Sequence, residues 1–343
     1  MKILYAIQGT GNGHISRGIE IIPHLKKHGD VDILISGAEW ELNFPFKVKY
    51  RLGGMSFVFG KNGGVDLFNT YLKLNSFRFM REIKSVPVEE YDLVISDFEP
   101  ISCWATHLKK IPCIGLSNQV ATLHRDAPVP KNSDRLGKLV LEHYAPVTKK
   151  YGYHFKALDE NIFTPVIRSE IRNCNIKDKG HITVYLPSYD DERIIKNLKN
   201  FKQVDWQVFS KHNKKKFKEK NIYIEPISNA AFVKSMSESS GVLCNAGFGV
   251  TSETLFLNKK LCIIPMRTQY EQHCNAAMLK SMGVTVVKKL KSKHLNKIEN
   301  WIEKGKSVEV DYPDNAASIV KKIIVENYKV SYSPFDASSE LYQ

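Results

Sequence analysis

The sequence predicts an α/β protein with two domains, each built around a parallel sheet. One observation is the length of 343 residues, which exceeds the usual size of a single domain. Another is that short apolar, β-branched runs alternate with amphipathic stretches along the whole chain. Hydrophobic residues make up 43% and charged residues 25% of the chain, which is typical of a globular protein and argues against a disordered one.

The elements follow one another as strands and crossover helices. In the first half we expect strands at Lys2–Gln8, Asp32–Ser36, Leu93–Ser96 and Cys113–Leu116, and helices at Ser16–Lys27 and Ile101–Lys109. In the second half we expect strands at Ile182–Leu186, Trp206–Phe209, Ile222–Ile224, Gly241–Cys244 and Leu261–Ile264. Helices are expected there at Ala230–Ser237, Val250–Phe256 and Gln272–Ser281, with a last one near Asn315–Tyr328.

The segment Asn161–Lys179 is the predicted linker, because it carries Pro165, several charges and little periodicity. Residues 1–165 then form an N-terminal Rossmann-like domain and residues 180–315 a C-terminal one. Residues 316–343 form a helix and a polar tail, which either packs back on the first domain or is disordered.

Charge and cysteine content narrow the class of protein. The N-terminal apolar run Ile3–Ile7 is too short for a signal peptide, no stretch approaches 18 apolar residues, and the six cysteines form no CxxC pair. We expect a cytoplasmic protein with reduced cysteines and no metal site. The net charge of +14 favours anionic partners. The basic run Lys211–Lys220 indicates a solvated loop, or else a peripheral contact with the cytoplasmic membrane face or an anionic glycan. A nucleic-acid partner is not expected, because no recognised nucleic-acid module accompanies the charge.

A glycine-rich loop joins the first predicted strand to the first helix, where Gly11, Asn12 and Gly13 lead to His14. Backbone N–H groups and a helix N-terminus converge there at the carboxyl end of a parallel strand, a place where ligands bind. A dinucleotide fingerprint does not fit, because position 14 is histidine, and no Lys-Ser/Thr pair completes a P-loop. The alternative is a tight turn without a ligand.

His14 is the candidate general base, since a neutral imidazole at a cleft edge can accept the proton of a hydroxyl group. Asp97 ends an apolar strand at the same rim and is suited to orient that imidazole. The alternatives are a histidine that only hydrogen-bonds the turn and an aspartate that caps the next helix, a role for which Glu99 competes. Arg17 would hold an anion or an acceptor group, or form a surface salt bridge.

A second glycine-containing loop, residues 245–249, again lies between an apolar strand and a helix. The donors suited to a diphosphate are the amides of Gly249, Val250 and Thr251 and the hydroxyls of Thr251 and Ser252. Glu253, one turn into the helix, can accept two hydrogen bonds from a ribose diol. Its alternative is a favourable contact with the helix dipole.

A polar loop also opens after the next strand. Glu271 and Gln272 offer acceptors and donors to sugar hydroxyls, and Asn275, one helical turn after Glu271, points along the same face. Ser188, which follows the strand at Ile182–Leu186, is a further candidate contact to the donor phosphates or base, or a simple turn residue.

These motifs resemble, in order, those of the GT-B superfamily, which includes the UDP-glycosyltransferases and the bacterial N-acetylglucosaminyltransferase acting on undecaprenyl-linked muramoyl-pentapeptide. GTGNGHISR at 9–17 is similar to the glycine-histidine loop of the bacterial enzyme. NAGFGVTSE at 245–253, with Gly247 and Glu253 in matching places, resembles the donor motif of the UDP-glycosyltransferases, and EQHCNA at 271–276 resembles the segment that closes it. DFEPISCW at 97–104 is similar to the segment that carries the dyad aspartate in the eukaryotic branch.

The resemblance implies two Rossmann-like domains facing across a cleft. It implies an inverting, metal-independent transfer of a hexose-type sugar from a nucleoside diphosphate sugar, with a UDP-sugar expected, to an acceptor hydroxyl; the nucleotide sugar is a co-substrate and no other cofactor is expected. Glu253 would bind the ribose, Glu271 and Gln272 the donor sugar, and His14 would be the base aligned by Asp97.

One departure concerns the phosphate contact, because Asn245 replaces the histidine of the plant motif, although an amide can still donate a hydrogen bond. The stretch Gly53–Phe79 is the expected acceptor wall, and the acceptor itself is open: a lipid-linked saccharide, a polysaccharide end at the bacterial cell envelope or a small molecule. Two other functions are also open, a nucleotide-sugar 2-epimerase with the same fold and a catalytically inert nucleotide-sugar binding protein.

Overall fold

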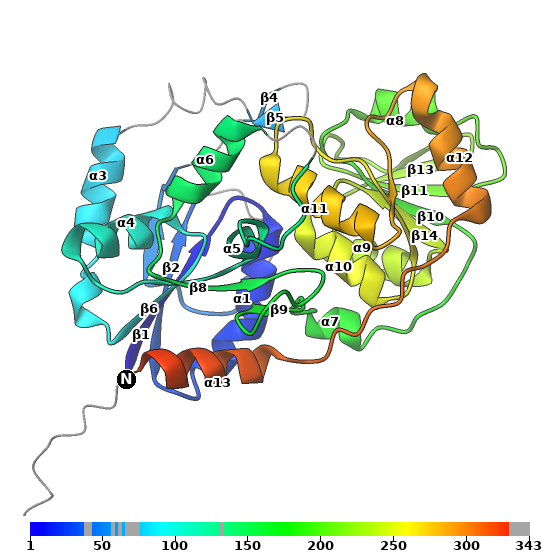
Figure 1. Ribbon diagram of the computed structural model, residues 1–343. Coiled ribbons are helices and arrows are strands. Elements are labelled where there is room, and N and C mark those ends of the chain that lie inside the picture. Colours follow the sequence, from blue (N-terminus) through cyan, green and yellow to red (C-terminus); the bar gives the residue numbers. More distant parts are fainter. Residues whose placement is uncertain (38–42, 56–58, 61–63, 66–75, 131–133, 329–343) are drawn as a thin grey trace, which may run out of the picture.

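The computed structural model describes the chain except for residues 38–42, 56–58, 61–63, 66–75, 131–133 and 329–343. Its described residues form two large sheets with helices packed on their faces (Figure 1), in the strand orders β3-β2-β1-β6-β7-β8-β9 and β12-β13-β11-β10-β14-β15-β16. The predicted α/β class is therefore confirmed. Much of the expected acceptor wall, Gly53–Phe79, lies outside the described residues.

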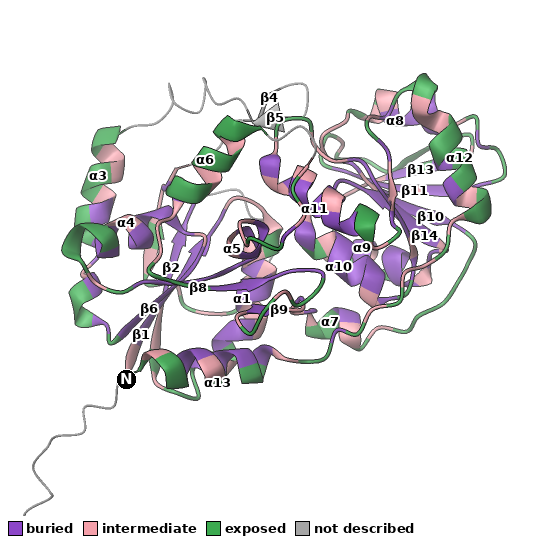
Figure 2. Cartoon of the chain, viewed as in Figure 1, coloured by how far each residue is buried: buried purple, intermediate pink, exposed green. Residues whose placement is uncertain are grey.

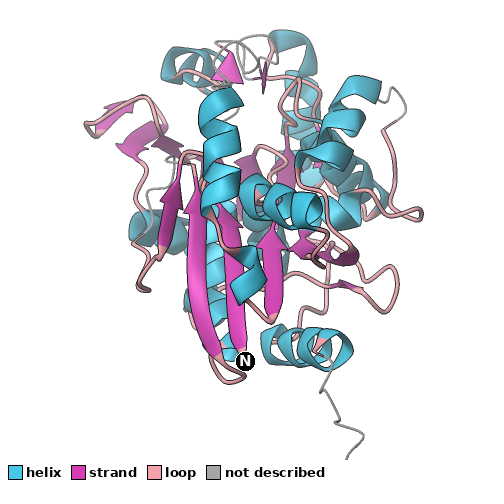
Figure 3. Cartoon of the chain, turned by 90° about the vertical axis from the view of Figure 1, so that its left-hand side faces the viewer, coloured by secondary structure: helices cyan, strands magenta, loops and turns pink. Residues whose placement is uncertain are grey.

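All described neighbours in the first sheet are parallel. Its strands are β1 (Lys2–Gln8), β2 (Asp30–Ser36), β3 (Tyr50–Leu52), β6 (Leu93–Asp97), β7 (Ile114–Ser117), β8 (Lys149–Tyr153) and β9 (Ile162–Phe163). Its helices are α1 (Asn12–Leu25), α3 (Ser76–Ser85), α4 (Pro100–Lys109), α5 (Asn118–Thr122) and α6 (Arg135–Tyr144). In a separate two-stranded sheet, β4 (Phe59–Gly60) pairs antiparallel with β5 (Gly64–Val65). Figure 3 shows the strands of this sheet side by side with helices around them.

The second sheet is parallel except for one edge strand. Its strands are β10 (Ile182–Tyr185), β11 (Trp206–Ser210), β12 (Phe217–Glu219), β13 (Ile222–Pro226), β14 (Gly241–Cys244), β15 (Lys260–Ile263) and β16 (Thr285–Val286). The helices of this half are α7 (Ser169–Arg172), α8 (Asp191–Leu198), α9 (Asn229–Glu238), α10 (Phe248–Phe256), α11 (Tyr270–Ser281), α12 (Leu295–Lys304) and α13 (Ala316–Asn327).

Burial on both faces explains why β1 is a continuous apolar run. Ile3, Tyr5 and Ile7 pack into the core that includes α1, whereas Leu4 and Ala6 pack into the core that includes α3 and α4. Figure 2 shows the central strands of both sheets as buried. Buried strands of this kind end at the rims that carry the predicted site residues.

The basic run was expected to be a loop, and this expectation is wrong in part. Residues Phe217–Glu219 of the run form the exposed strand β12, which pairs antiparallel with β13. An edge strand can carry lysines because one of its sides faces solvent. Its contact with an anionic membrane or glycan stays a prediction.

Helix α13 returns to the first sheet and packs against α1 (Figure 1), with Ile319 and Ile323 in the same apolar cluster as Ile15 and Ile21. The predicted linker contains β9 and α7, and the division into domains stays a prediction. Residues 331–343, the rest of the expected tail, lie outside the described residues. In the part of the chain that the structure describes, no helix combines the length and apolar character needed to cross a bilayer.

Candidate active site

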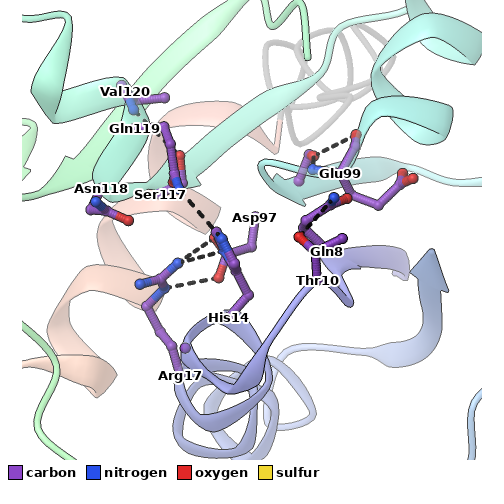
Figure 4. Close-up of polar contacts among 12 residues, drawn as sticks. Gln8, Thr10, His14, Arg17, Asp97, Glu99, Ser117, Asn118, Gln119 and Val120 are labelled. Atoms are coloured by element: carbon purple, nitrogen blue, oxygen red, sulfur yellow. Dashed lines mark hydrogen bonds and ion pairs between the residues drawn. The ribbon is translucent and has the colours of Figure 1, made fainter. Parts of the chain in front are cut away.

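His14, Arg17 and Asp97 form one hydrogen-bonded cluster (Figure 4). Nδ1 of His14 lies 2.8 Å from Oδ1 of Asp97. Arg17 donates to the same carboxylate from Nε at 2.8 Å and from Nη2 at 2.5 Å, and its Nη2 also lies 2.9 Å from Nδ1 of His14. The turn from β1 into α1 and the end of β6 thus bring together residues that are 83 positions apart in the chain.

The Asp97 carboxylate is fully buried beside the imidazole of His14 and the guanidinium of Arg17. Burial alone would raise its pKa, but the charge of Arg17 and the contacts with His14 outweigh burial and hold the pKa below its usual value. Because an ionised carboxylate only accepts hydrogen bonds, it favours the His14 tautomer with a proton on Nδ1. Nε2 then keeps a lone pair with which it can accept a proton.

Glu99, which competed with Asp97 for the two roles, is the cap of α4. Its carboxylate accepts hydrogen bonds from the amides of Ile101 at 2.8 Å and Ser102 at 2.7 Å. Phe98, which lies between Asp97 and Glu99, has a left-handed backbone with φ of 58°. Its ring is stacked on that of His14, with 6.4 Å between the ring centroids.

The loop before α1 opens onto a cavity of about 180 Å³ that also borders α10. Gly11, the N-cap of α1, has a φ of 96°, which a residue with a side chain rarely adopts. The residues that line the cavity from the two halves of the chain are Asn12, Gly13, Ser16, Arg168, Tyr185, Ile227, Ser228, Asn229, Phe232, Gly249, Val250 and Glu253. Two helix N-termini, each carrying partial positive charge, therefore share one cavity.

The donors at the start of helix α10 differ in the hydrogen bonds that they already make. Its first amides, at Phe248, Gly249 and Val250, precede the first intrahelical hydrogen bond. Thr251 instead donates its amide to the carbonyl of Gly247 at 3.3 Å and its hydroxyl to the same carbonyl at 2.7 Å. Both Thr251 donors are thus used within the helix, and its contact with a phosphate stays a prediction.

Ser252 and three glycines near the cavity, unlike Thr251, make no contact that accounts for them within the protein. The Ser252 hydroxyl is buried and has no hydrogen-bond partner among the described residues. A Cβ built on Gly13, Gly247 or Gly249 would meet nothing within 4 Å. Packing therefore does not require glycine at these three positions.

Asn245 and Ser188 bond to each other. The Ser188 hydroxyl donates to Oδ1 of Asn245 at 3.1 Å, and Nδ2 of Asn245 donates to the carbonyl of Ile264 at 2.7 Å. The Asn245 amide therefore ties the ends of β10, β14 and β15 together. Its contact with a donor phosphate stays a prediction.

Glu253 is buried at the same cavity and is held by Arg168. Nε of Arg168 donates to Oε1 at 2.5 Å and Nη2 donates to Oε2 at 2.8 Å, while Nη1 donates to Asn229 at 2.8 Å. The sequence interpretation missed Arg168, because a single arginine after Pro165 in a predicted linker carries no periodic or motif signal.

Glu271, from the second half of the chain, bonds to two amide side chains of the first half. Its Oε1 accepts from Nδ2 of Asn118 and its Oε2 from Nε2 of Gln119, both at 2.9 Å. Nε2 of Gln119 also lies 3.4 Å from Nε2 of His14. Both amides were missed, although their place directly after a predicted strand at the rim was an available signal.

Gln272 and Asn275 bond to the backbone of neighbouring loops. Oε1 of Gln272 accepts from the amides of Ala246 at 3.1 Å and Met266 at 3.0 Å, and Nδ2 of Asn275 donates to the carbonyl of Ala246 at 3.0 Å. Both side chains hold the loop before α10 in place. Among the described residues, no group of three or more His, Cys, Asp and Glu side chains is arranged to hold a metal ion.

Comparison with known proteins identifies the family. The model described as glycosyl transferase family 1 matches residues 1–304, and no curated protein matches the sequence. Solved structures with a similar fold include the glycosyltransferase SnogD from Streptomyces nogalater, at 12% identity and a TM-score of 0.52, with 95% of this chain and 96% of that chain covered. They also include UGT89C1 from Arabidopsis thaliana complexed with quercetin, at 11% identity and a TM-score of 0.57, with 96% and 95% covered.

A third similar structure is UGT2 from Phytolacca americana complexed with UDP-2fluoro-glucose and pterostilbene, at 13% identity and a TM-score of 0.56, with 96% of this chain and 95% of that chain covered. These likenesses extend over nearly the whole chain and concern the fold. The chain therefore belongs to glycosyl transferase family 1 and is a glycosyltransferase with the GT-B fold.

Proposed function

We propose that this glycosyltransferase transfers a hexose-type sugar from a UDP-sugar to an acceptor hydroxyl, with inversion and without a metal ion. The observation that carries the proposal is the 2.8 Å contact between His14 and Asp97, beside a cavity of about 140 Å³ that His14 and Glu271 both line. An imidazole whose Nδ1 proton is held by a carboxylate has Nε2 available as a general base. A base at this position suits direct attack by an acceptor hydroxyl.

The glycines beside the 180 Å³ cavity support a nucleotide diphosphate as the leaving group. Gly13 and Gly249 have no packing neighbour that excludes a Cβ, so the close approach of a ligand to the backbone explains them better than packing does. The N-termini of α1 and α10 and the charge of Arg168 are suited to a developing negative charge. The UGT2 structure holds UDP-2fluoro-glucose, which supports a UDP-sugar as the donor here.

The proposed reaction is a single displacement. The acceptor oxygen forms a bond to the anomeric carbon, the bond from that carbon to the diphosphate oxygen breaks, and Nε2 of His14 takes the acceptor proton. The diphosphate leaves with the bonding electron pair toward the two helix N-termini. Glu253 would accept hydrogen bonds from the ribose and Glu271 from the donor sugar.

A thermal-shift panel tests the donor first. UDP, GDP and ADP are compared with UDP-glucose, UDP-galactose and UDP-N-acetylglucosamine, since a ligand at 100 times its Kd stabilises the fold by about 2.7 kcal/mol. We expect UDP and one UDP-sugar to raise the melting temperature most. With that donor and a mixture of glycoside and alcohol acceptors, His14→Ala should slow UDP release by roughly a hundredfold or more. The rise in melting temperature that UDP causes should be the same in His14→Ala as in the wild type.

Other outcomes separate the two rival functions. Interconversion of two UDP-sugar epimers without any acceptor would favour a 2-epimerase. UDP binding without transfer or epimerisation would favour an inert binding protein. An unchanged rate in His14→Ala would overturn the assignment of the base.

A further inference from the structure

Arg17 is a buried neighbour of the proposed base. It follows His14 by three positions in α1, so the two side chains lie on the same face of the helix. Only 7% of the residue is exposed, and its guanidinium carbon lies 5.2 Å from the centroid of the Tyr153 ring. Arg17 is not among the described residues that line either cavity. Its influence on the reaction must therefore pass through the residues that it contacts.

The guanidinium of Arg17 binds both carboxylate oxygens of Asp97 (Figure 4). Nε donates to Oδ2 at 2.8 Å and Nη2 donates to Oδ1 at 2.5 Å. Two parallel hydrogen bonds from a planar group fix both the position and the plane of a carboxylate. Nδ1 of His14 lies 2.8 Å from the same Oδ1. The oxygen that orients the imidazole is thus also the oxygen that Nη2 of Arg17 holds.

The charge of Arg17 also reaches the imidazole directly, because Nη2 lies 2.9 Å from Nδ1 of His14. When the imidazole carries its proton on Nδ1, both nitrogens donate to the carboxylate, and the contact between them is one of two donors. If Nε2 then took a second proton, the contact would lie between two cations, which repel each other. The guanidinium therefore disfavours the protonated imidazole.

The two buried charges act on His14 in opposite directions. A buried carboxylate alone would strongly favour the imidazolium, since opposite charges attract more strongly where water is excluded. An imidazolium has no lone pair on Nε2, so a dyad without a cation beside it would hold the base in its spent form. Arg17 compensates the charge of Asp97 and leaves the hydrogen bond to Nδ1 in place.

We infer that Arg17 is a positioning residue for the proposed base, which fixes the carboxylate of Asp97 on Nδ1 of His14 and by its charge keeps Nε2 unprotonated. This inference rests on the proposed function and adds a residue to its base. The other titratable groups on the cavity beside His14 are Asp134, before α6, and Tyr270 and Glu271 of α11. They are the same in every variant below, so a change in pH dependence reports on Arg17 and Asp97.

Arg17→Gln and Arg17→Lys separate the charge of the residue from its paired hydrogen bonds. Glutamine keeps a donor for Asp97 without the charge, whereas lysine keeps the charge without the planar fork. UDP release is measured from about pH 5.5 to 9.5, a range that spans the titration of histidine. The assay uses the UDP-sugar that stabilises the protein most and the fastest acceptor of the glycoside and alcohol mixture.

The expected signature of the charge is a shifted pH profile. In the wild type, kcat/KM for the acceptor should fall on the acidic side as His14 becomes protonated. In Arg17→Gln this fall should begin at least about one pH unit higher, so the variant loses most activity near neutral pH and recovers toward the wild-type rate in alkali. A residue needed only for packing would instead lower the rate by the same factor at every pH.

The expected signature of the fork is a lower kcat without such a shift. Arg17→Lys should keep the wild-type pH dependence and lose roughly tenfold or more in kcat at every pH, because one ammonium cannot hold both carboxylate oxygens in place. Arg81→Gln, at an exposed arginine of α3, is the matched control and should change neither property. A wild-type rise in melting temperature with UDP shows that each variant is folded.

A measurement on His14 itself does not depend on the donor or the acceptor. Long-range proton–nitrogen correlation spectra of protein with isotope-labelled histidine report which ring nitrogen carries a proton, and the signals absent from His14→Ala identify His14. The ring should become protonated at higher pH in Arg17→Gln than in the wild type. It should become protonated at lower pH in Asp97→Asn, where the guanidinium acts without the carboxylate. An unchanged titration in both folded variants would overturn the inference.

The failure of the inference and that of the proposed function have different signatures. If the acidic fall in kcat/KM disappeared in His14→Ala but kept its position in Arg17→Gln, Arg17 would be a packing residue only, and the transferase would stand. If the acidic fall persisted in His14→Ala, or if no acceptor caused UDP release, His14 would not be the base, and the proposed function would fail together with the inference.

Discussion

Arg168 holds both carboxylate oxygens of Glu253, with donor–acceptor distances of 2.5 and 2.8 Å. Burial alone would lower the pKa of the arginine, but the charge of Glu253 outweighs burial and raises it. The pair joins the segment between the two sheets to the first turns of α10, at the wall of the proposed nucleotide pocket. A ribose diol at Glu253 would share that carboxylate with Arg168.

Arg168→Met should therefore weaken the fold and the nucleotide site together. Removing one partner leaves the buried Glu253 charge uncompensated, so we expect the free energy of unfolding to fall by roughly 3 kcal/mol. UDP binding should weaken at least about tenfold, because the carboxylate loses the contact that fixes its position. Urea titration and calorimetric titration with UDP measure the two effects. Arg81→Met, at an exposed arginine of α3, is the control; wild-type UDP affinity in Arg168→Met would contradict the prediction.

Gly249→Ala should separate ligand approach from folding. The added Cβ meets nothing within 4 Å, and alanine is the better helix former by about 1 kcal/mol, so the ligand-free protein should be as stable as the wild type or slightly more stable. UDP affinity should nevertheless fall at least about tenfold if the diphosphate contacts this backbone. Gly241→Ala is the contrasting variant, because its Cβ would lie 2.9 Å from the carbonyl oxygen of Lys260; it should lose stability and keep its affinity for UDP.

Asp97→Asn should reduce catalysis more than it changes donor binding. The amide no longer favours the His14 tautomer with a free Nε2, so we expect kcat to fall about a thousandfold or more with the donor KM nearly unchanged. Initial rates of UDP release, with the donor varied at saturating acceptor, separate the two constants. Asp311→Asn, at an exposed position, should retain full activity; a wild-type kcat in Asp97→Asn would refute the dyad.

The stability contributed by Asp97 should also depend on pH in a defined direction. Its pKa is lower in the folded state than the usual 3.8, so the folded state binds the proton less readily than the unfolded state does. The contribution is complete above the unfolded pKa and is lost as the pH falls through the folded one. Urea denaturation of the wild type and Asp97→Asn should therefore give a constant difference in the free energy of unfolding at pH 6 to 7, and this difference should narrow below about pH 4. A difference that grew on acidification would contradict this sign.

His154 should limit the stability of the fold in mild acid. Burial, with a smaller effect of His124, lowers its pKa from 6.5 to about 4, and Nδ1 accepts a hydrogen bond from the amide of Phe155 at 2.8 Å. The folded state favours the neutral ring. The contribution of His154 to the free energy of unfolding is therefore complete above pH 6.5 and falls by up to about 3 kcal/mol as the pH approaches 4. His154→Gln should reduce this loss in urea titrations between pH 7 and 4, whereas His28→Gln, at an exposed site, should not.

The central strands and the glycine loops could be predicted because their signals are local. β1 and β14 match the predicted bounds, since burial on both faces requires an uninterrupted apolar run. The strands β3, β9 and β16 were missed: each has two or three residues and incomplete burial. Such short edge segments become strands only through pairing with a neighbour, which the sequence pattern does not encode.

The sequence by itself determined the α/β class, the histidine at the start of α1 and the aspartate at the end of β6. These follow from the rule that the carboxyl ends of parallel strands share one rim. Only the tertiary structure decided the partners: Arg168 for Glu253, 85 positions away, and Gln119 for Glu271, 152 positions away. Those contacts depend on how the two sheets face each other, and no local period or spacing records that arrangement.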